Sequence, residues 1–388
     1  MGQVLLDFLY TNIGRGHPHY LDGIIECLPS ESIGHVADVF SASDGIARPA
    51  WSAVRRLYHA AAKGGIVASL YNKLRTESDY DRRSTMLRLL SRGLTRAFPE
   101  DERPLVVGHP LLVAIMTNKP ALVYQHGEVV APRESWVKGP HRILVPLSKT
   151  ADTFLDAGFS KDQIFVSGLC VEPSLAVMAE SAMNDRSKRL SRLAPLCGAF
   201  FSSGAEPLAH VEAIVAAALS VHQRDGRAIV FAQRDGRLER EMRTSHGAAC
   251  CELKAVDSVR EVAELSSQSL LCRYRGRKEL NEFTAALFAD FDYFVAPSHE
   301  RTNWALGLGL PMFVVDPPLG SFAPLNRQVL LDAGVAKRLR AHSDATGFGE
   351  AVNNIRGSGE LHGMAEAGWQ DSNICGFENI AAWVDSEF

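Results

Sequence analysis

The chain has 388 residues, of which 46% are hydrophobic and 22% are charged, and its formal net charge is −4. This composition excludes a disordered chain, and the length suits two domains of roughly 150 residues or more each. The weak negative charge argues against a general DNA or RNA binder, because an anionic partner would have to meet a local basic patch.

The sequence contains no recognisable targeting or membrane-spanning segment. Met1–Tyr10 lacks a basic stretch and a cleavage site, and no uncharged apolar run approaches the ~18 residues of a membrane span. The seven cysteines are scattered without C-x-x-C spacing, which is typical of reduced thiols rather than of a disulfide or zinc framework. We therefore expect a cytoplasmic protein without a bound metal or cofactor.

The first part of the chain alternates apolar runs of strand length with helical patterns. Val4–Tyr10 leads through a glycine loop into a helical stretch at Tyr20–Leu28, which is the opening strand–helix unit of a doubly wound sheet. Further strands are predicted at Gly34–Phe40, Leu105–Val107, Ala121–Tyr124, Ile143–Pro146 and Ile164–Ser167, and helices at Pro49–Phe98 and Lys149–Ala157. We expect one α/β domain over residues 1–171.

A second alternation of strands and helices follows the charged helical segment Ser174–Leu193. The predicted strands are Ala199–Ser202, Ala228–Ala232, Tyr293–Ala296 and Met312–Val315, and the predicted helices are Ala209–His222, Ser258–Glu264 and Thr302–Gly307. They indicate a second α/β domain over residues 172–365. In residues 366–388, Phe377, Ile380 and Trp383 recur at helical spacing and would form one apolar face of a helix. This face would be buried if the helix packed back on the first domain.

Three stretches carry a family resemblance: the loop Gly14–His17, the segment Ile143–Leu175, and the block Phe291–Ala336 with Gly309-Leu310-Pro311 inside it. In order and spacing they resemble the glycosyltransferases of the GT-B fold, in particular the branch with the bacterial cell-wall GlcNAc transferase and the galactolipid synthases. The resemblance implies two Rossmann-like domains that face a central cleft. It also implies an inverting, metal-independent glycosyltransferase that moves a sugar from a UDP-linked nucleotide sugar to an acceptor hydroxyl.

Two positions depart from that family's pattern. Five residues before Gly309 the family places a Glu that holds the ribose hydroxyls, whereas this chain has Trp304. Before Asn326 the family often carries a Gln-containing element that contacts the sugar, whereas this chain has Ser321–Pro324. Glu300 is the nearest acid that could hold the ribose instead.

The candidate acceptor-side residues lie in the first domain, where loops and strands end. His17 begins the helix after the glycine loop, where a neutral imidazole could take the acceptor proton, and His126 ends an apolar strand. These two are the catalytic candidates. Gly14, Gly16, His109 and Glu128 are the other acceptor-side candidates. The structural alternatives are a plain tight turn for the glycines, loop ordering for His17 and a satisfied core position for His109 and His126.

The candidate nucleotide-sugar residues lie in the second domain. A loop after a strand can offer backbone N–H groups to a diphosphate, and the start of a later helix would meet the nucleotide. The residues are Ser202, Ser203, Gly204, Ser298, His299, Glu300, Arg301, Thr302 and Asn326. The cluster Arg273, Arg275, Arg277 and Lys278 could also reach phosphate, although four cations within six residues are more often a solvated face.

One further segment is strongly basic and could bind an anionic membrane surface. Between Gly45 and Thr76 there are six Lys or Arg residues and no acidic residue, with apolar residues at mainly helical spacing. The six are Arg48, Arg55, Arg56, Lys63, Lys73 and Arg75. A basic amphipathic helix can lie on anionic lipid, and a core-facing helix with a solvated basic side is the alternative. The expected partners are thus a nucleotide sugar, an unidentified acceptor and, at the periphery, an anionic membrane.

Two other functions stay open from the sequence. A nucleotide-sugar hydrolase would use water in place of the acceptor, with His17 acting on it. A non-catalytic binding protein is suggested by Trp304 and by the missing Gln-containing element.

Overall fold

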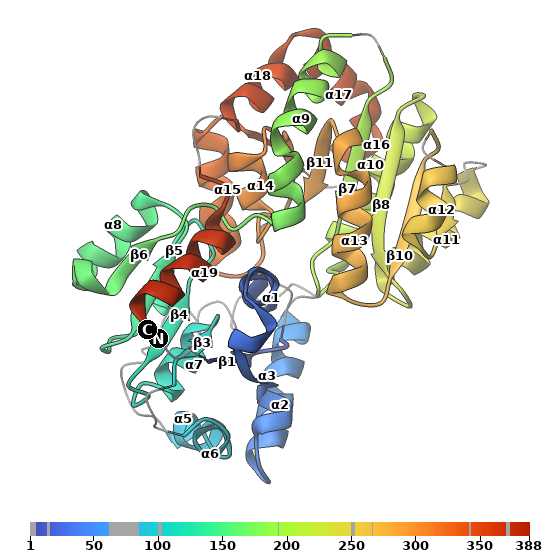
Figure 1. Cartoon of the computed structure of the whole chain (residues 1–388). Coiled ribbons are helices and arrows are strands. Elements are labelled where there is room, and N and C mark those ends of the chain that lie inside the picture. Colours follow the sequence, from blue (N-terminus) through green and yellow to red (C-terminus); the bar gives the residue numbers. More distant parts are fainter. Residues whose placement is uncertain are drawn as a thin grey trace. The chain divides into compact units, whose positions relative to one another are not determined.

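The computed structural model describes residues 5–13, 16–61, 85–99, 103–192, 194–249, 253–265, 267–340, 343–369 and 373–388. The chain divides into two compact units (Figure 1). The first comprises Met1–Pro173, Gly320–Phe322 and Asn373–Phe388, and the second comprises Ser174–Leu319 and Ala323–Ser372. Each unit has its own parallel sheet with helices on it. The prediction of two doubly wound α/β domains is therefore confirmed.

The first sheet has the strand order β2-β1-β3-β4-β5-β6. Its strands are β1 (Leu6–Tyr10), β2 (Ile33–Asp38), β3 (Leu105–Val107), β4 (Leu122–Gln125), β5 (Arg142–Val145) and β6 (Ile164–Val166). The strand predicted at Gly34–Phe40 ends two residues earlier, because the Asp38 carboxylate accepts hydrogen bonds from the backbone N–H groups of Phe40 (2.7 Å) and Ser41 (2.9 Å). Asp38 thereby caps a short helix instead of continuing the strand.

The helices of the first unit cover both faces of this sheet. They are α1 (Gly16–Cys27), α2 (Val39–Ala42), α3 (Ala47–Ala61), α5 (Thr85–Leu90), α6 (Leu94–Ala97), α7 (Pro110–Ile115), α8 (Ser148–Asp156) and α19 (Gly376–Glu387). Successive strand residues alternate between two cores: Phe8 joins α1 and α19, whereas Leu9 joins the cluster that includes α3, α5 and α7. The helical pattern predicted across Pro49–Phe98 falls partly on residues 62–84, which lie outside the described residues.

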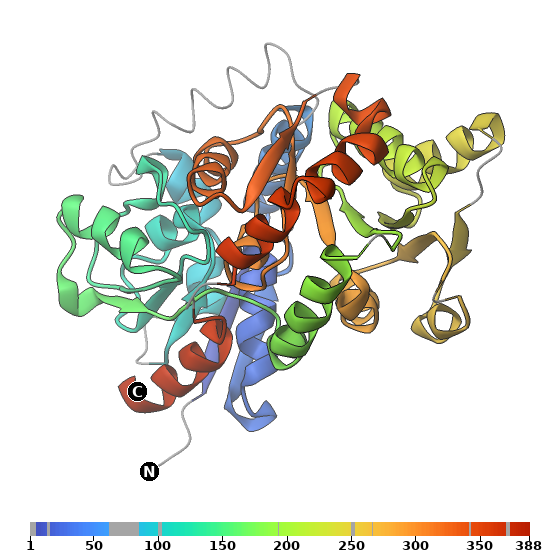
Figure 2. The same cartoon turned by 90° about the horizontal axis from the view of Figure 1, so that it is seen from above.

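The last helix, α19, belongs to the first unit and lies beside α1 in both views (Figures 1 and 2). Phe377, Ile380 and Val384 are fully buried in the core that α1 shares with the sheet. A Cβ atom on Gly23 of α1 would lie 2.3 Å from the ring of Phe377, so only glycine allows the two helices to approach this closely.

The second sheet has the strand order β13-β12-β11-β7-β8-β10-β9. Its strands are β7 (Cys197–Phe201), β8 (Arg227–Gln233), β9 (Lys254–Val256), β10 (Leu270–Tyr274), β11 (Tyr293–Ala296), β12 (Met312–Val315) and β13 (Ala336–Leu339). Of these, β9, β10 and β13 were not among the predicted strands. The two central strands β7 and β11 are buried along their whole length.

The helices of the second unit include α10 and α17, which pack against each other through Gly349. The helices are α9 (Pro173–Leu190), α10 (Leu208–Gln223), α11 (Arg237–Ala249), α12 (Val259–Glu264), α13 (Arg277–Leu287), α14 (Thr302–Gly307), α15 (Phe322–Asp332), α16 (Ser343–Thr346), α17 (Phe348–Gly357) and α18 (Glu360–Ala367). Within the described ranges of the whole chain, no helix has both the length and the apolar content needed to cross a membrane.

Candidate functional site

The carboxyl ends of β7 and β11 bring together most of the predicted nucleotide-sugar residues. The two strands are hydrogen-bonded neighbours in parallel register, so the loops that follow them lie at the same edge of the second sheet. Ser202, Ser203 and Gly204 follow β7, and Pro297–Arg301 follow β11 and lead into α14. Ser202 and Ser298 are buried, whereas Ser203 and Gly204 are partly exposed.

Ser298 and Asn326 connect the loop after β11 to α15 by hydrogen bonds. The Ser298 hydroxyl donates a hydrogen bond to the Ala323 carbonyl oxygen at 2.8 Å, and the Asn326 amide donates one to the Ser298 carbonyl oxygen at 3.1 Å. Both side chains are almost completely buried. In the structure, these two predicted ligand residues fix α15 to the loop after β11.

Arg301 is the most unusual charge at this edge, because its side chain is only 8% exposed. One guanidinium nitrogen pairs with the Glu300 carboxylate at 2.8 Å, and Cζ lies 4.0 Å from the centre of the Phe201 ring and 4.9 Å from that of the Trp304 ring. The Nε atom is buried without a hydrogen-bond partner. The cation is thus held by aromatic faces and one carboxylate, with one donor unsatisfied.

Trp304 packs in the core and does not line the surface of the site. Its side chain is 1% exposed, and its ring meets those of Phe201 and Phe294 edge-on at 5.6 and 5.9 Å. Trp304 therefore stands in the position where the resembled family has a ribose-binding Glu, but its side chain is part of the core. Because Arg301 and Trp304 are three residues apart at the start of α14, the indole instead supports the guanidinium.

Three further buried polar atoms of the described residues at this edge lack a hydrogen-bond partner. They are the Thr302 hydroxyl oxygen at the start of α14, the Nδ1 atom of His210 in α10, and Oε1 of Glu206 in the loop between β7 and α10. His210 donates from Nε2 to the Pro317 carbonyl oxygen at 2.7 Å, and burial lowers its pKa to about 4. Its Nδ1 is therefore a bare acceptor. Together with Arg301 Nε, four unpartnered buried atoms lie at this sheet edge, and these are the atoms that a polar ligand could contact there.

His210 was not among the predicted site residues. It lies in the first turn of a helix that the sequence does predict, directly after the Ser202–Gly204 loop. The available signal was a histidine in the first turn of a mainly apolar helix that follows a candidate ligand loop.

The predicted arginine cluster has a different role. Arg273 lies in β10 and pairs with the carboxylates of Asp257 and Glu239, and Arg275 lies 3.7 Å from the Glu279 carboxylate. Acidic neighbours thus neutralise Arg273, whereas the pair of Arg275 with Glu279 is long and exposed.

In the first unit, His17 and His109 come together at the carboxyl edge of the sheet. Their ring centres are 4.5 Å apart at an interplanar angle of 62°. His109 caps α7: its Nδ1 accepts a hydrogen bond from the Leu111 N–H at 3.1 Å, which leaves the proton on Nε2 of the neutral ring. A Cβ atom on Gly108 would lie 3.1 Å from the His17 carbonyl oxygen, so glycine lets α1 approach β3 here.

His126 follows β4, the neighbour of β3, but both of its ring nitrogens are already engaged. Nε2 donates to the Val130 carbonyl oxygen at 2.9 Å, and Nδ1 lies 3.0 Å from the Tyr124 hydroxyl, from which it accepts. The side chain is 2% exposed, and burial lowers its pKa to about 4.

Glu128, two residues further, is also buried. Gly16 begins α1, and Gly14 lies outside the described residues.

A cavity of about 540 Å³ lies at the opposite, amino edge of the second sheet. Two ion pairs lie in its lining: Arg189 with Asp292 at 2.7 Å, and Arg227 with Asp290 at 2.6 Å. Because these pairs neutralise both arginines that line the cavity, we assign the candidate site to the carboxyl edge. In the described part of the chain, no group of three or more His, Cys, Asp or Glu side chains is arranged to hold a metal ion.

No family model matches the sequence, and no curated protein matches it. Solved structures do match the whole chain. UDP-GlcNAc 2-epimerase from Neisseria meningitidis bound to UDP-GlcNAc has a TM-score of 0.55 at 12% identity, covering 99% of this chain and 98% of that chain. Putative UDP-N-acetylglucosamine 2-epimerase from Listeria monocytogenes has 0.58 at 11%, covering 100% and 97%. MurG of Acinetobacter baumannii has 0.51 at 12%, covering 99% and 100%. At these identities the similarity establishes the fold.

Proposed function

We propose, from the GT-B fold that this chain has, that the protein binds a nucleotide sugar, UDP-linked, and transfers the sugar to an acceptor hydroxyl with inversion. The observation that carries the proposal is the buried Arg301 guanidinium with an unsatisfied Nε, next to the unsatisfied Thr302 hydroxyl. Two structures of the same fold, one solved with UDP-GlcNAc and another with UDP, support the nucleotide-sugar part of the proposal.

The second unit would hold the donor. Departure of a nucleoside diphosphate leaves negative charge on phosphate oxygens, and fixed donors in a dry site stabilise such charge strongly. Arg301 supplies a cation that its aromatic neighbours keep away from bulk water, and the loop Ser202–Gly204 supplies backbone N–H groups at the end of β7. Glu300 is the acid beside Arg301 that could accept hydrogen bonds from ribose hydroxyls.

The first unit would bind the acceptor and take its proton. His17 is partly exposed, and its ring packs edge-on against His109. The acceptor oxygen attacks C1 of the sugar as the C1–O bond to the diphosphate breaks. The diphosphate leaves with the electron pair, and His17 takes the acceptor proton. His126 offers no nitrogen to an acceptor, so we assign it to the support of this edge.

The reaction products distinguish this proposal from its competitors. Epimerisation of the donor sugar, suggested by the names of two neighbours, would give a C2 epimer without any acceptor. Hydrolysis would release free sugar without an acceptor. A binding protein would hold UDP and turn over nothing. Transfer requires that UDP release from a UDP-sugar depend on an added acceptor, which a coupled UDP assay across a panel of acceptors measures.

Replacing Arg301 by methionine is expected to weaken UDP binding about 10- to 100-fold in a calorimetric titration. The reason is that a hydrogen bond to a charged group contributes roughly 1.5–3 kcal/mol. Arg301→Lys keeps the charge and should retain part of the affinity. Arg243→Met is the matched control, because Arg243 is 68% exposed on α11. Equal UDP affinity in Arg301→Met and in the wild type would contradict the assignment.

A further inference from the structure

Two cysteines lie opposite each other where the linker that follows β6 meets the segment before α19. Cys170 and Cys375 form an isolated antiparallel bridge, and the Gly376 N–H beside it donates to the Leu169 carbonyl oxygen at 3.0 Å. This hydrogen bond flanks the bridge, so the two cysteines are a closely spaced pair with Cα atoms roughly 4.5 Å apart and side chains on one side. A disulfide requires Cα atoms about 4.4–6.8 Å apart, and the backbone here meets that requirement.

Glycines beside both cysteines allow the two segments to approach each other. A Cβ atom on Gly168, whose φ is +96°, would lie 2.7 Å from the Asn373 carbonyl oxygen, and one on Gly376 would lie 2.6 Å from the Gly168 carbonyl oxygen. A side chain at either position would push the segments apart. The sequence around Cys170 and Cys375 therefore favours their close approach.

The pair lies where the chain leaves the first unit and where it finally returns to it. The first unit runs to Pro173 and resumes for the last time at Asn373. Cys170 is three residues before the first of these points, and Cys375 is two residues after the second. A bond between the two sulfur atoms would close residues 171–374 into one covalent loop, which would strongly constrain the unfolded chain.

The two thiols differ in their surroundings. Cys375 is exposed, whereas Cys170 is completely buried and its Sγ accepts a hydrogen bond from the Gln125 amide at 3.4 Å. Burial raises the pKa of Cys170 to about 12, and it also raises the pKa of Cys375. Cys375 is thus the thiol that an oxidant in solution meets first, and mildly alkaline solution supplies its reactive thiolate form.

We infer that Cys170 and Cys375 form a reversible disulfide when the protein meets a small-molecule disulfide such as oxidised glutathione. The Cys375 thiolate attacks one sulfur of that molecule, forms a mixed disulfide and releases one glutathione thiolate. Cys170 then loses its proton and attacks the Cys375 Sγ, and the second glutathione thiolate leaves. The released thiolates take up the two protons that the cysteines lost. Two protein thiols are oxidised, one molecule of oxidised glutathione is reduced to two of glutathione, and the inference does not depend on the reaction proposed above.

Cys27 is a competing partner for Cys375. It is half-buried at the end of α1, which packs on α19, and a charge on Cys375 would raise its pKa. The backbone of Cys375, however, is bridged to that of Cys170, and we therefore assign the bond to Cys170. Cys27→Ser is thus the matched control for Cys375→Ser.

The test is incubation of the full chain with excess oxidised glutathione at about pH 8.5, followed by alkylation of the remaining thiols. Mass spectrometry of an unreduced digest should show peptides joined through Cys170 and Cys375, which dithiothreitol separates. The oxidised chain should melt roughly 5–10 °C higher than the reduced chain, because the closed loop lowers the entropy of the unfolded state. Cys375→Ser should show neither the bond nor the shift, whereas Cys27→Ser should show both.

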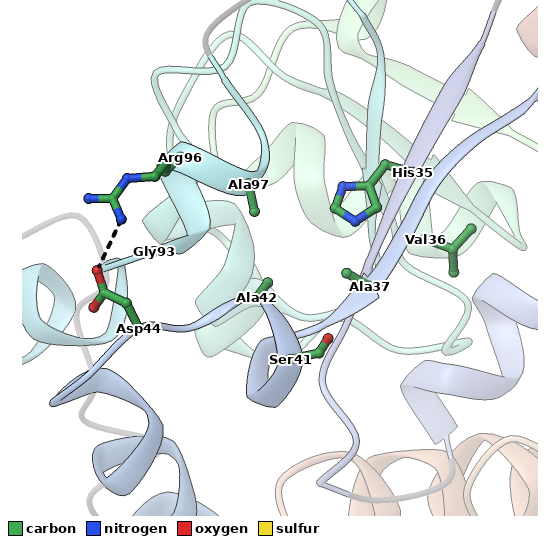
Figure 3. A pocket seen from close by; sticks show the side chains of 9 residues that line it. All are labelled: His35, Val36, Ala37, Ser41, Ala42, Asp44, Gly93, Arg96 and Ala97. Carbon is green, nitrogen blue, oxygen red and sulfur yellow. Dashed lines mark ion pairs between the residues drawn. The ribbon is translucent and has the colours of Figure 1, made fainter.

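Hydrogen exchange shows whether oxidation acts locally. It should slow exchange of the backbone amides in residues 168–171 and 373–377. The internal reference is a cavity of about 390 Å³ beside the edge strand β2 of the same unit, which His35, Asp44 and Arg96 help to line (Figure 3). Its lining residues include no cysteine, so exchange there should be unchanged.

A disulfide between Cys27 and Cys375 would overturn the inference. So would glutathione that stays on Cys375 while Cys170 remains a thiol, because the second exchange step would then not occur. Recovery of both Cys170 and Cys375 as alkylated thiols after oxidation would overturn it as well.

Discussion

Replacing His17 by glutamine is expected to lower the kcat of sugar transfer about 100- to 10,000-fold, which is the usual contribution of a positioned general base. His17 is partly exposed at the carboxyl edge of the first sheet, and His109 packs edge-on against its ring at 4.5 Å. The donor site is assigned to the second unit, so the Kd for UDP should stay unchanged. A loss in kcat without a loss in UDP affinity separates a base from a ligand of the nucleotide.

His19→Gln is the matched control, because His19 is on the same helix two residues further on. Its Nδ1 lies 3.9 Å from the Glu172 carboxylate, so the structure gives it a different partner. This variant should keep most of the transfer rate. If His17→Gln retained more than about a tenth of kcat, another group would have to take the proton.

Acidification is expected to destabilise both units as the pH falls from about 6.5 to about 4. Burial lowers the pKa values of His126 and His141 in the first unit and His210 in the second from 6.5 to about 4. Below pH 6.5 these histidines bind protons in the unfolded chain but stay neutral in the folded chain. The free energy of unfolding therefore decreases as the pH falls from about 6.5 to about 4. Each histidine accounts for up to about 3 kcal/mol, since one pKa unit corresponds to about 1.4 kcal/mol.

Urea denaturation at a series of pH values measures this loss. His141→Leu should flatten the pH dependence, because it removes one of the three groups. It should cost little at neutral pH, because both ring nitrogens of His141 are buried without a hydrogen-bond partner. A free energy of unfolding that stays constant between pH 6.5 and 4 would show that these histidines are not buried as described.

Most strands that the sequence predicts are dominated by apolar residues. The missed strands β10 and β13 contain charged residues, and their charges are satisfied only by distant parts of the chain. Arg273 of β10 pairs with Glu239, and Arg338 of β13 pairs with Asp316. Tertiary partners thus overrode local propensity, which a reading along the chain cannot detect.

The edges of the sheets could be predicted because polar residues follow apolar strands. The role of each side chain at these edges could not be predicted, because it depends on packing between elements that are distant in the sequence. Trp304 occupies a position where a resemblance places a ribose ligand, yet it is buried against Phe201 and Phe294. Likewise, His126 looks like an edge histidine in sequence, but Tyr124 and the Val130 carbonyl engage its nitrogens.

Hydrogen exchange of the full chain with and without UDP tests the location of the donor site most directly. We predict that UDP slows exchange in the backbone amides of Ser202–Glu206 and Ser298–Trp304, and that Arg301→Met removes most of this protection. Protection around the cavity of Arg189, Arg227 and Asp292 at the opposite edge of the sheet would contradict the assignment. So would the absence of protection anywhere in the chain at saturating UDP.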